Sequence, residues 1–352
     1  MHVVKQSNVK KVLVIKMSSI GDIIHTFPAL TDAMKAHPNI RFDWVVEAPF
    51  VELPRLHKGV DKVLVSQRRA WQKRRFSLKT WSEKRAFKHL IQQQEYDFVI
   101  ENQYTRKGAK VAKIARGIRC GLDKRSADDA DISRHFDHAF YVSKSLHAIE
   151  RTRKLFALAL DYEYNEAELD FGIDLSRLNT DFMKALAFDF TQPFQVFCQG
   201  TTWQTKHLPP EKWVALLGKA KQDAVPVILP WTGQAEKKQV ENIVREAGYG
   251  VMLPEQSLTN WAAIINASQG VIGVDTGLTH LAAALEKPTL ALFGPTNPFL
   301  TGVKGMKARN EYLNLKCSPC MSETCARGLS CLQQIAMERV WLAFNGLQNR
   351  EV

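Results

Sequence analysis

Short, nearly uninterrupted runs of apolar residues recur along this chain and constrain its fold more than any other feature. In the first half they cover residues 11–16, 42–46, 62–65 and 97–100. Runs of this kind are typical of strands buried on both faces of a parallel sheet. Helical patterns separate several of the runs, beginning with residues 23–30. The first half is therefore predicted to be an open α/β domain.

A second series of the same kind follows a segment of different composition. Between about 161 and 193 the chain becomes acidic and loosely patterned, and we expect the interdomain connection there. We then expect strands over 194–198, 225–229, 270–275 and 289–293, and helices over 210–222, 234–247, 258–267 and 278–285. A length of 352 residues suits about two domains. The sequence thus predicts α/β domains over 1–178 and 190–334, with a ligand cleft between them at the carboxyl ends of their strands.

The basic residues are unevenly distributed. The chain carries a formal net charge of +12, of which residues 1–178 contribute +10 and residues 179–352 contribute +2. Such an excess favours an anionic partner but does not distinguish nucleic acid, phosphorylated lipid and nucleotide. Residues 51–125 alone hold 20 basic and 7 acidic side chains. We expect the captured anion to meet this stretch.

No targeting or membrane-spanning segment is recognisable in the sequence. The apolar run at residues 12–15 is too short for a signal-peptide core and far shorter than the roughly 20 residues that cross a bilayer. Cys120 and Cys198 stand isolated, and the six cysteines do not form a secretory disulfide pattern. The sequence predicts a cytosolic protein.

The first candidate site is the loop that follows the first strand. It contains Ser18, Ser19 and Gly21, and its small residues allow backbone N–H groups to face a ligand. Asp22 stands at the start of the next helix, where the helix dipole favours its ionised form, and it is a candidate general base. The same spacing fits a residue that only caps the first helical turn. The dinucleotide fingerprint G-x-G-x-x-G is absent here.

The second candidate site follows the strand at 270–275. Asp275, Thr276, Gly277, Leu278 and His280 lie in a polar turn and the helix start after it. Hydroxyl and backbone donors at a helix start suit a diphosphate. The alternative is a capped helix in which Asp275 or Thr276 is the cap and His280 packs as an ordinary helical residue.

The third candidate site follows the strand at 194–198. Thr201 and Thr202 can donate hydrogen bonds to phosphate oxygens, and Lys206 can neutralise their charge. A single lysine in a loop is usually only solvated. Here, however, three turns follow strand ends and can converge on one cleft.

These motifs together resemble the ADP-heptose:lipopolysaccharide heptosyltransferases of glycosyltransferase family 9, most closely the heptosyltransferase I branch. The resemblance is carried, in the family's order, by residues 16–26 with 28–30, 42–47, 147–153, 201–202 with 206–207, 229–231, 275–281 and 293–296. The segment Glu101-Asn102-Gln103-Tyr104-Thr105-Arg106-Lys107 departs from the family pattern, which has neutral, small residues there.

The resemblance implies a GT-B fold, in which two Rossmann-like domains face each other across a central cleft. It implies acceptor binding by the N-terminal domain, nucleotide-sugar binding by the C-terminal domain, and a final helix at about 335–352 that returns to the first domain. The implied reaction is inverting, metal-independent transfer of L-glycero-D-manno-heptose from ADP-heptose to Kdo of lipid A in the lipopolysaccharide inner core. No cofactor is implied.

The resemblance also implies a role for each candidate residue. Asp22 would be the base, while Lys206, Thr201, Thr202 and the Thr276–Gly277 helix start, with Leu278 beside it, would stabilise the departing diphosphate. Asp275 would orient heptose hydroxyls, Glu236 would hold the adenosine ribose, and His280 would support the phosphate site. Ser18, Ser19 and Gly21 would bind the acceptor together with the basic residues Arg68, Arg69, Lys73, Arg74 and Arg75.

The expected partners are the ADP-heptose donor, the Kdo-lipid A acceptor and the anionic cytoplasmic face of the inner membrane, by peripheral association and without nucleic acid. One alternative is a family 9 transferase that adds a later heptose or uses another nucleotide-sugar. From a different class, the basic run with its aromatic neighbours Trp71, Phe76 and Trp81 also fits a nucleic-acid-binding protein.

Two metal interpretations compete with this assignment. Asp129 and Asp131 fit the Asp-x-Asp string of metal-dependent transferases, but they lie in a polar loop with no strong apolar strand before it. The cysteines at 317, 320, 325 and 331 fit either a structural zinc site or a thiol packing cluster. We expect neither group to take part in catalysis.

Overall fold

The structure is a computed structural model that describes residues 11–328 and 330–349. The chain divides between Leu175 and Ser176 into two compact units. The division falls inside the acidic segment where the connection was expected, slightly before the expected domain end at 178. Each unit contains a parallel sheet with helices on its faces, so the predicted α/β class with two parallel sheets is confirmed.

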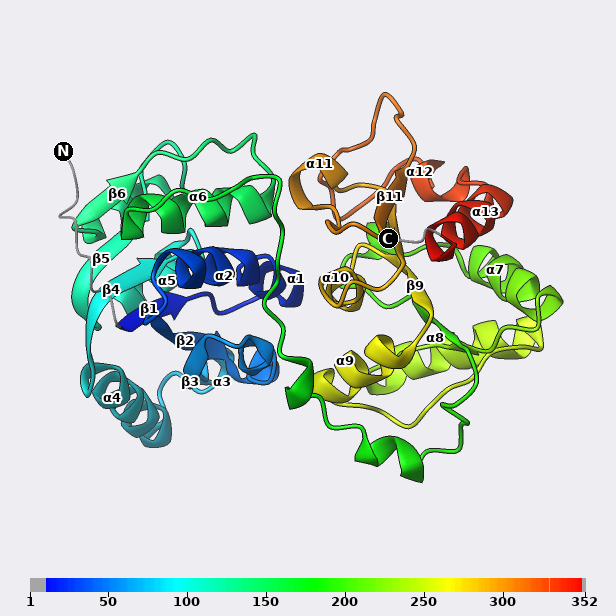
Figure 1. Ribbon diagram of the computed structural model, residues 1–352, viewed down its shortest axis with the longest axis horizontal. Helices are drawn as coiled ribbons and strands as arrows, with labels where there is room; N and C mark the ends of the chain where they lie inside the picture. The colour runs from blue at the N-terminus through cyan, green and yellow to red at the C-terminus, as the bar shows by residue number, and fades with distance from the viewer. Residues whose placement is uncertain (1–10, 329, 350–352) are drawn as a thin grey trace. The chain divides into compact units, whose positions relative to one another are not determined.

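The first unit is built on six strands within its described residues, in the order β3-β2-β1-β4-β5-β6 (Figure 1). All neighbouring strands are parallel, and the order is that of doubly wound Rossmann sheets. The strands are β1 (Lys11–Ile15), β2 (Arg41–Glu47), β3 (Val60–Ser66), β4 (Glu95–Glu101), β5 (Arg116–Leu122) and β6 (His138–Phe140).

Helices cover both faces of this sheet, which is why the strands read as continuous apolar runs. Leu13 and Ile15 of β1 pack in a cluster with Trp71 and Phe87, while β2 presents Phe42 to Phe156 on the other face. The helices are α1 (Ile20–Ile24), α2 (Phe27–Ala36), α3 (Arg68–Lys73), α4 (Leu78–Gln92), α5 (Arg106–Ala112) and α6 (Ala148–Leu160).

A buried ion pair joins two helices of the first unit. Arg153 of α6 is fully buried, and its Nε donates to Asp32 Oδ2 of α2 at 2.7 Å. Its second nitrogen, Nη2, donates to the carbonyl oxygens of Asn165 and Glu168. Because a buried guanidinium without partners is strongly destabilising, this arrangement fixes α2 against α6 and the segment that follows.

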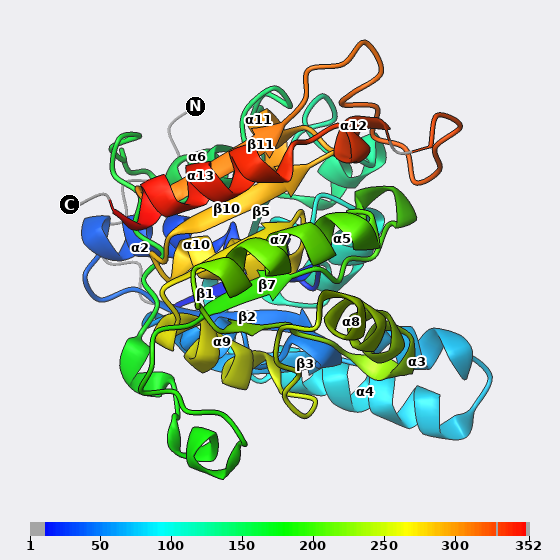
Figure 2. The same ribbon diagram turned by 90° about the vertical axis from the view of Figure 1, so that its right-hand side faces the viewer.

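The second unit contains five strands within its described residues, in the order β11-β10-β9-β7-β8, again all parallel. Figure 2 labels β11, β10 and β7 of this sheet. The strands are β7 (Gln195–Cys198), β8 (Val227–Ile228), β9 (Gly270–Val274), β10 (Thr289–Phe293) and β11 (Ala308–Tyr312). The helices are α7 (Pro210–Gln222), α8 (Gly233–Ala247), α9 (Leu258–Ala267), α10 (Gly277–Ala284), α11 (Pro298–Thr301), α12 (Ser330–Gln333) and α13 (Met337–Gln348).

The last helix belongs to the second unit. The apolar face of α13 repeats at helical spacing and packs against α7 and β10, in one core with Phe197 and Trp213. The indole N–H of Trp341 donates to Asp223 Oδ2 at the end of α7, at 2.9 Å. The expectation that a helix at about 335–352 returns to the first domain is therefore wrong for residues 337–348, because their apolar stripe completes the second core. Residues 350–352 lie outside the described residues.

The longest helices are α4 and α8, with 15 residues each. Across the described ranges, none of the helices combines the length and the apolar character needed to cross a membrane.

Close approach between α10 and the sheet gives a stability prediction. A Cβ on Gly273 of β9 would lie 2.1 Å from Thr279 Oγ1, which is held by its hydrogen bond to Val274 O. We expect Gly273→Ala to lower the free energy of unfolding by about 1–3 kcal/mol, because an overpacked core must shift its neighbours. Urea-induced unfolding measures this change.

Gly218 of α7 is the matched control, because a Cβ there meets nothing within 4 Å. Gly218→Ala is expected to leave stability unchanged or raise it by roughly 0.5–1 kcal/mol through helix propensity. If Gly273→Ala is as stable as Gly218→Ala, the close packing of α10 on β9 does not require a glycine at position 273.

Candidate functional site

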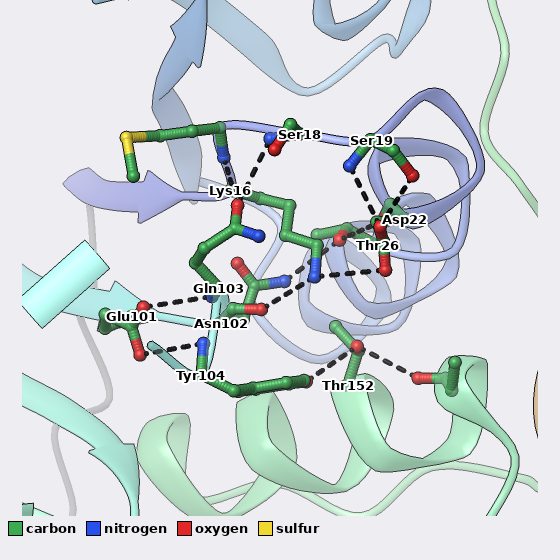
Figure 3. A network of polar contacts seen from close by, with 12 residues as sticks. Lys16, Ser18, Ser19, Asp22, Thr26, Glu101, Asn102, Gln103, Tyr104 and Thr152 are labelled. Carbon is green, nitrogen blue, oxygen red and sulfur yellow. Dashed lines mark hydrogen bonds and ion pairs between the residues drawn. The ribbon is translucent and has the colours of Figure 1, made fainter. Parts of the chain in front are cut away.

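A buried lysine organises the polar cluster at the carboxyl end of β1 (Figure 3). Lys16 is only 4% exposed, and its ammonium lies 3.4 Å from Asp22 Oδ1 and donates to Asn102 O at 3.0 Å. The ring centroid of Tyr104 lies 5.0 Å from the same nitrogen. Since a buried ammonium is costly without opposite charge or acceptors, these neighbours fix its position.

Asp22 is held on two sides and open on a third. The backbone N–H and the hydroxyl of Ser19 donate to Asp22 Oδ2 at 2.9 and 2.7 Å, so the aspartate does cap the start of α1. Partial removal of water from around this carboxyl acts to raise its pKa. The charges of Lys16 and His25 and the hydrogen bonds from Ser19 outweigh that effect and lower the pKa to about 2. The side chain is still 43% exposed. The site therefore presents an ionised, accessible carboxylate.

The loop after β4 holds the loop after β1 in place. Gln103 Oε1 accepts hydrogen bonds from the backbone N–H groups of Met17 and Ser18, at 2.8 and 3.1 Å. Glu101 in turn accepts from the backbone N–H groups of Gln103 and Tyr104, at 3.1 and 3.2 Å (Figure 3). These contacts position Ser18, Ser19 and Asp22. No role for Lys16, Glu101 or Gln103 was predictable from the sequence motifs.

A cavity of about 100 Å³ lies beside this cluster. Its lining includes Ser18, Arg68, Arg69, Gln103 and Lys107, so three of the expected acceptor residues come together there. Glu47 also lines it and partly balances the three cations. The cavity suits a small anionic group.

The rest of the basic run lies elsewhere. Arg74 pairs with Glu83 at 3.2 Å, and the guanidinium of Arg75 lies 4.6 Å from the centroid of the Phe76 ring. Lys73 is exposed near the end of α3. Gly21 lies inside α1, where its carbonyl accepts from His25 N. Lys73, Arg74, Arg75 and Gly21 therefore do not line the cavity with Ser18, Arg68 and Arg69.

Asp275 is the centre of a second cluster, in the second unit. Its Oδ2 lies 2.8 Å from Lys206 Nζ and accepts from Thr296 Oγ1 at 2.7 Å, while Oδ1 lies 3.2 Å from His280 Nε2. Burial acts to raise the pKa of Asp275, but His280 and Lys206 outweigh it and hold the pKa well below its ordinary value. Asp275 thus anchors Lys206 as an ionised partner, and His280 is part of this network.

Two loops and a helix start surround the anchored lysine. Thr201 Oγ1 donates to the Asp275 carbonyl at 3.1 Å, and Lys206 Nζ lies 4.7 Å from the Trp203 ring centroid. Thr276 is the N-cap of α10, with no capping bond from its hydroxyl, so this hydroxyl and the first-turn N–H groups at Gly277 and Leu278 are candidate anion donors. Thr202 is exposed in the same loop as Thr201.

Glu236 lies beside this cluster, in the first turn of α8. The backbone N–H of Thr232 donates to its Oε2 at 2.8 Å. A Cβ on Gly200 would lie 2.4 Å from Oε1, so the glycine lets the carboxylate approach the loop that carries Thr201. Burial raises the pKa of Glu236, although the Thr232 N–H and His207 oppose the shift. A polar acceptor thus lies next to the phosphate-binding candidates.

Of the residues in this second cluster, Thr296 and Trp203 had no role predicted from the sequence. Both lie in loops that follow strands, Thr296 after β10 and Trp203 after β7. Thr296 is part of the family motif at 293–296, but that motif did not indicate what Thr296 contacts.

The aspartates of one competing metal motif contact arginine residues, and the cysteines of the other are not bonded to one another. Asp129 accepts from Arg106 N at 2.8 Å, and Asp131 pairs with Arg106 and Arg134 at 3.0 and 3.5 Å. Cys317, Cys320 and Cys331 are free thiols, and Cys325 Sγ accepts from Arg327 N. Within the part of the chain that the structure describes, no group of three or more histidine, cysteine, aspartate or glutamate side chains is placed to hold a metal ion.

Glu101 gives a pH prediction. Its burial, opposed by Lys16 and three backbone N–H groups, raises the pKa of this carboxyl to about 8. Between pH 4.5 and 8 the folded chain keeps a proton that the unfolded chain releases, so stability falls as pH rises, by up to about 1.4 kcal/mol per pH unit. Glu101→Gln should flatten this slope in unfolding measured from pH 5 to 8.

The control is Glu163→Gln, since Glu163 is exposed. It should leave the slope as it is in the parent chain. If both variants show the parent slope, Glu101 does not retain its proton in the folded state.

The chain is similar to known proteins over most of its length. The model of glycosyltransferase family 9 (heptosyltransferase) matches residues 84–330. Lipopolysaccharide heptosyltransferase 1 of Pseudomonas aeruginosa is 40% identical over 316 residues, which are 90% of this chain and 87% of that protein.

Solved structures agree with the sequence comparison. The structure of Escherichia coli heptosyltransferase WaaC with ADP matches with a TM-score of 0.83 and 33% identity, covering 96% of this chain and 99% of that one. WaaC with ADP-2-deoxy-2-fluoro heptose matches with a TM-score of 0.81 at the same identity and coverage. The fold is that of the GT-B heptosyltransferases, and the chain belongs to glycosyltransferase family 9.

Proposed function

We propose that this protein is an inverting heptosyltransferase that transfers L-glycero-D-manno-heptose from ADP-heptose to a hydroxyl of Kdo on lipid A, at the cytoplasmic face of the inner membrane. Its similarity to proteins named lipopolysaccharide heptosyltransferase 1, and to WaaC with ADP and with a fluorinated ADP-heptose, supports the donor. The observation that carries the proposal is that one unit presents an ionised, exposed Asp22 and the other an anchored Lys206 beside a helix start.

On the donor side, the proposed task is to hold and release ADP. Lys206 would neutralise diphosphate charge that grows as the glycosidic bond breaks, while Thr201, Thr202 and the start of α10 donate hydrogen bonds to it. Because Asp275 and Trp203 fix the lysine, little reorganisation is needed when the charge develops. Glu236 would accept from a ribose hydroxyl.

On the acceptor side, Asp22 would take the proton of the attacking hydroxyl. A carboxylate with a low pKa is a weak base toward an alcohol, but the hydroxyl becomes strongly acidic as its oxygen bonds to the anomeric carbon. Proton transfer late in the step therefore suits Asp22. The cavity lined by Arg68, Arg69 and Lys107 would bind the acceptor's carboxylate beside Ser18.

Asp22→Asn tests this function directly. The amide oxygen can still accept from Ser19, so the loop should keep its shape while the base is lost. Transfer from ADP-heptose to Kdo-lipid A should fall by at least about 10²-fold, with ADP affinity within about twofold of the parent. Radiolabelled transfer and calorimetric ADP titration measure the two quantities.

The matched control is Asp128→Asn, an exposed carboxylate of the same unit. It should keep the parent rate; unchanged turnover in Asp22→Asn would remove Asp22 from the mechanism. Acceptors that already carry one heptose, and other nucleotide-sugars, distinguish the proposed reaction from a later transfer or another donor.

Lys206→Ala tests the donor side. Loss of one charge-assisted contact, worth about 1.5–3 kcal/mol, should weaken ADP-heptose binding by roughly 10- to 100-fold and slow transfer. Lys238→Ala, an exposed lysine of α8, is the control and should leave both unchanged. Because the variant leaves Asp275 without the ammonium of Lys206, thermal unfolding is used to verify that the second unit is still folded. An effect confined to acceptor affinity would mean that the two sites are assigned backwards.

A further inference from the structure

An exposed apolar corner joins α3 to α4. Phe76 is 88% exposed, Leu78 is 89% exposed and Trp81 is 66% exposed. Among the large apolar side chains in the described ranges, Leu78 and Phe76 are the two most exposed. We call residues 75–85 the α3–α4 corner.

The corner is exposed because other residues of the same helices form the core. Phe87 and Ile91 of α4 and Trp71 of α3 pack on the first sheet, and the Trp71 indole N–H donates to Glu83 Oε2 at 2.9 Å. The Trp71 and Phe87 ring centroids lie 5.5 Å apart. This packing holds α3 against α4, while Phe76, Leu78 and Trp81 at the turn and the start of α4 remain exposed.

Cations stand directly beside the exposed rings. The guanidinium of Arg75 lies 4.6 Å from the Phe76 ring centroid, and that of Arg85 lies 5.8 Å from the Trp81 ring centroid. The corner contains four basic side chains, Arg75, Lys79, Lys84 and Arg85, and one acidic side chain, Glu83, which pairs with Arg74. An apolar tip surrounded by cations complements a surface that offers anionic groups above an apolar interior.

We propose that the α3–α4 corner inserts into an anionic phospholipid bilayer. Phe76, Leu78 and Trp81 enter the boundary between headgroups and acyl chains, and Arg75, Lys79 and Arg85 contact lipid phosphates. Tryptophan prefers this boundary because one part of its ring is apolar and its N–H is polar. Clustered cations near an anionic leaflet add electrostatic attraction. The inference rests on the proposed function only in that a lipid-linked acceptor requires a membrane.

The corner is separate from the acceptor cavity. Arg68 and Arg69 line the cavity beside Ser18, whereas residues of the corner do not line it. The basic run thus divides into a part that faces the site and a part that faces outward. Membrane binding and transfer can therefore be measured independently.

The test compares binding of the full chain to vesicles of phosphatidylcholine alone and of an equal mixture with phosphatidylglycerol. The parent should sediment with the mixed vesicles only. A triple variant, Phe76→Ser with Leu78→Ser and Trp81→Ser, should weaken this binding at least about tenfold, since three inserted side chains are lost. Lys79→Gln with Arg85→Gln should weaken it and reduce its dependence on salt.

A control removes three exposed large apolar side chains from the second unit: Phe299→Ser with Met306→Ser and Leu342→Ser, which are 70%, 82% and 64% exposed. This variant should bind as the parent does. In the parent, lipids brominated near the headgroup should quench tryptophan fluorescence, and the quenching should decrease in Trp81→Phe while that variant still binds. Circular dichroism verifies that all variants are folded.

Several outcomes would overturn the proposal. They are unchanged binding of the apolar triple variant, binding that appears only when Kdo-lipid A is in the vesicle, and tighter binding to single-stranded RNA than to the mixed vesicles. Transfer to a de-acylated, water-soluble acceptor distinguishes the two hypotheses. If vesicle binding fails and this transfer persists, only the membrane proposal fails. If binding follows the expected pattern and no heptose is transferred, the proposed function fails.

Discussion

A lysine ammonium withdrawn from water must lie against carboxylate or carbonyl oxygens, and both candidate clusters are organised by this requirement. In the first unit Lys16 sits between Asp22 and the carbonyl of Asn102. In the second unit Lys206 sits against Asp275. Lys16 follows β1 and contacts Asn102, which follows β4. Lys206 lies in the loop after β7 and contacts Asp275, which follows β9. These two ion pairs hold charged side chains at the carboxyl ends of parallel strands, which is where α/β sheets bind their ligands.

The sequence predicted the central strands well because burial on both faces leaves a continuous apolar signal. It did not predict β11, the edge strand beside β10, which reads as Ala308-Arg309-Asn310-Glu311-Tyr312. Nor did it predict β5, whose glycines and arginines interrupt the apolar run. Edge and interrupted strands bury fewer side chains, so they lack the pattern that marks the others.

Candidate residues that lie in contiguous family motifs were predictable from the sequence. Residues that reach the site because the fold brings distant segments together were not. Gln103 supports Ser18 across 85 residues of sequence because β1 and β4 are neighbours, and that pairing is not readable from composition or periodicity. The departure from the family pattern at 101–107 was the one signal, since this segment supplies Gln103 and Lys107 to the cavity. In the basic run, by contrast, residues close in sequence lie on different surfaces. Arg68 and Arg69 line the cavity, whereas Arg75 lies beside the exposed Phe76.

The place of α13 bears on how the protein is made. Its apolar face completes the second core, and Leu332 just before it packs against Gly294, two residues ahead of Thr296. The first unit is complete once the chain has been synthesised to Leu175, including the segment after α6 that holds Arg153, whereas the second lacks part of its core until α13 has left the ribosome. The first unit can therefore fold during translation while the second waits. A nascent chain would acquire its Lys206–Asp275 ion pair last, after the first unit with Asp22 had already formed.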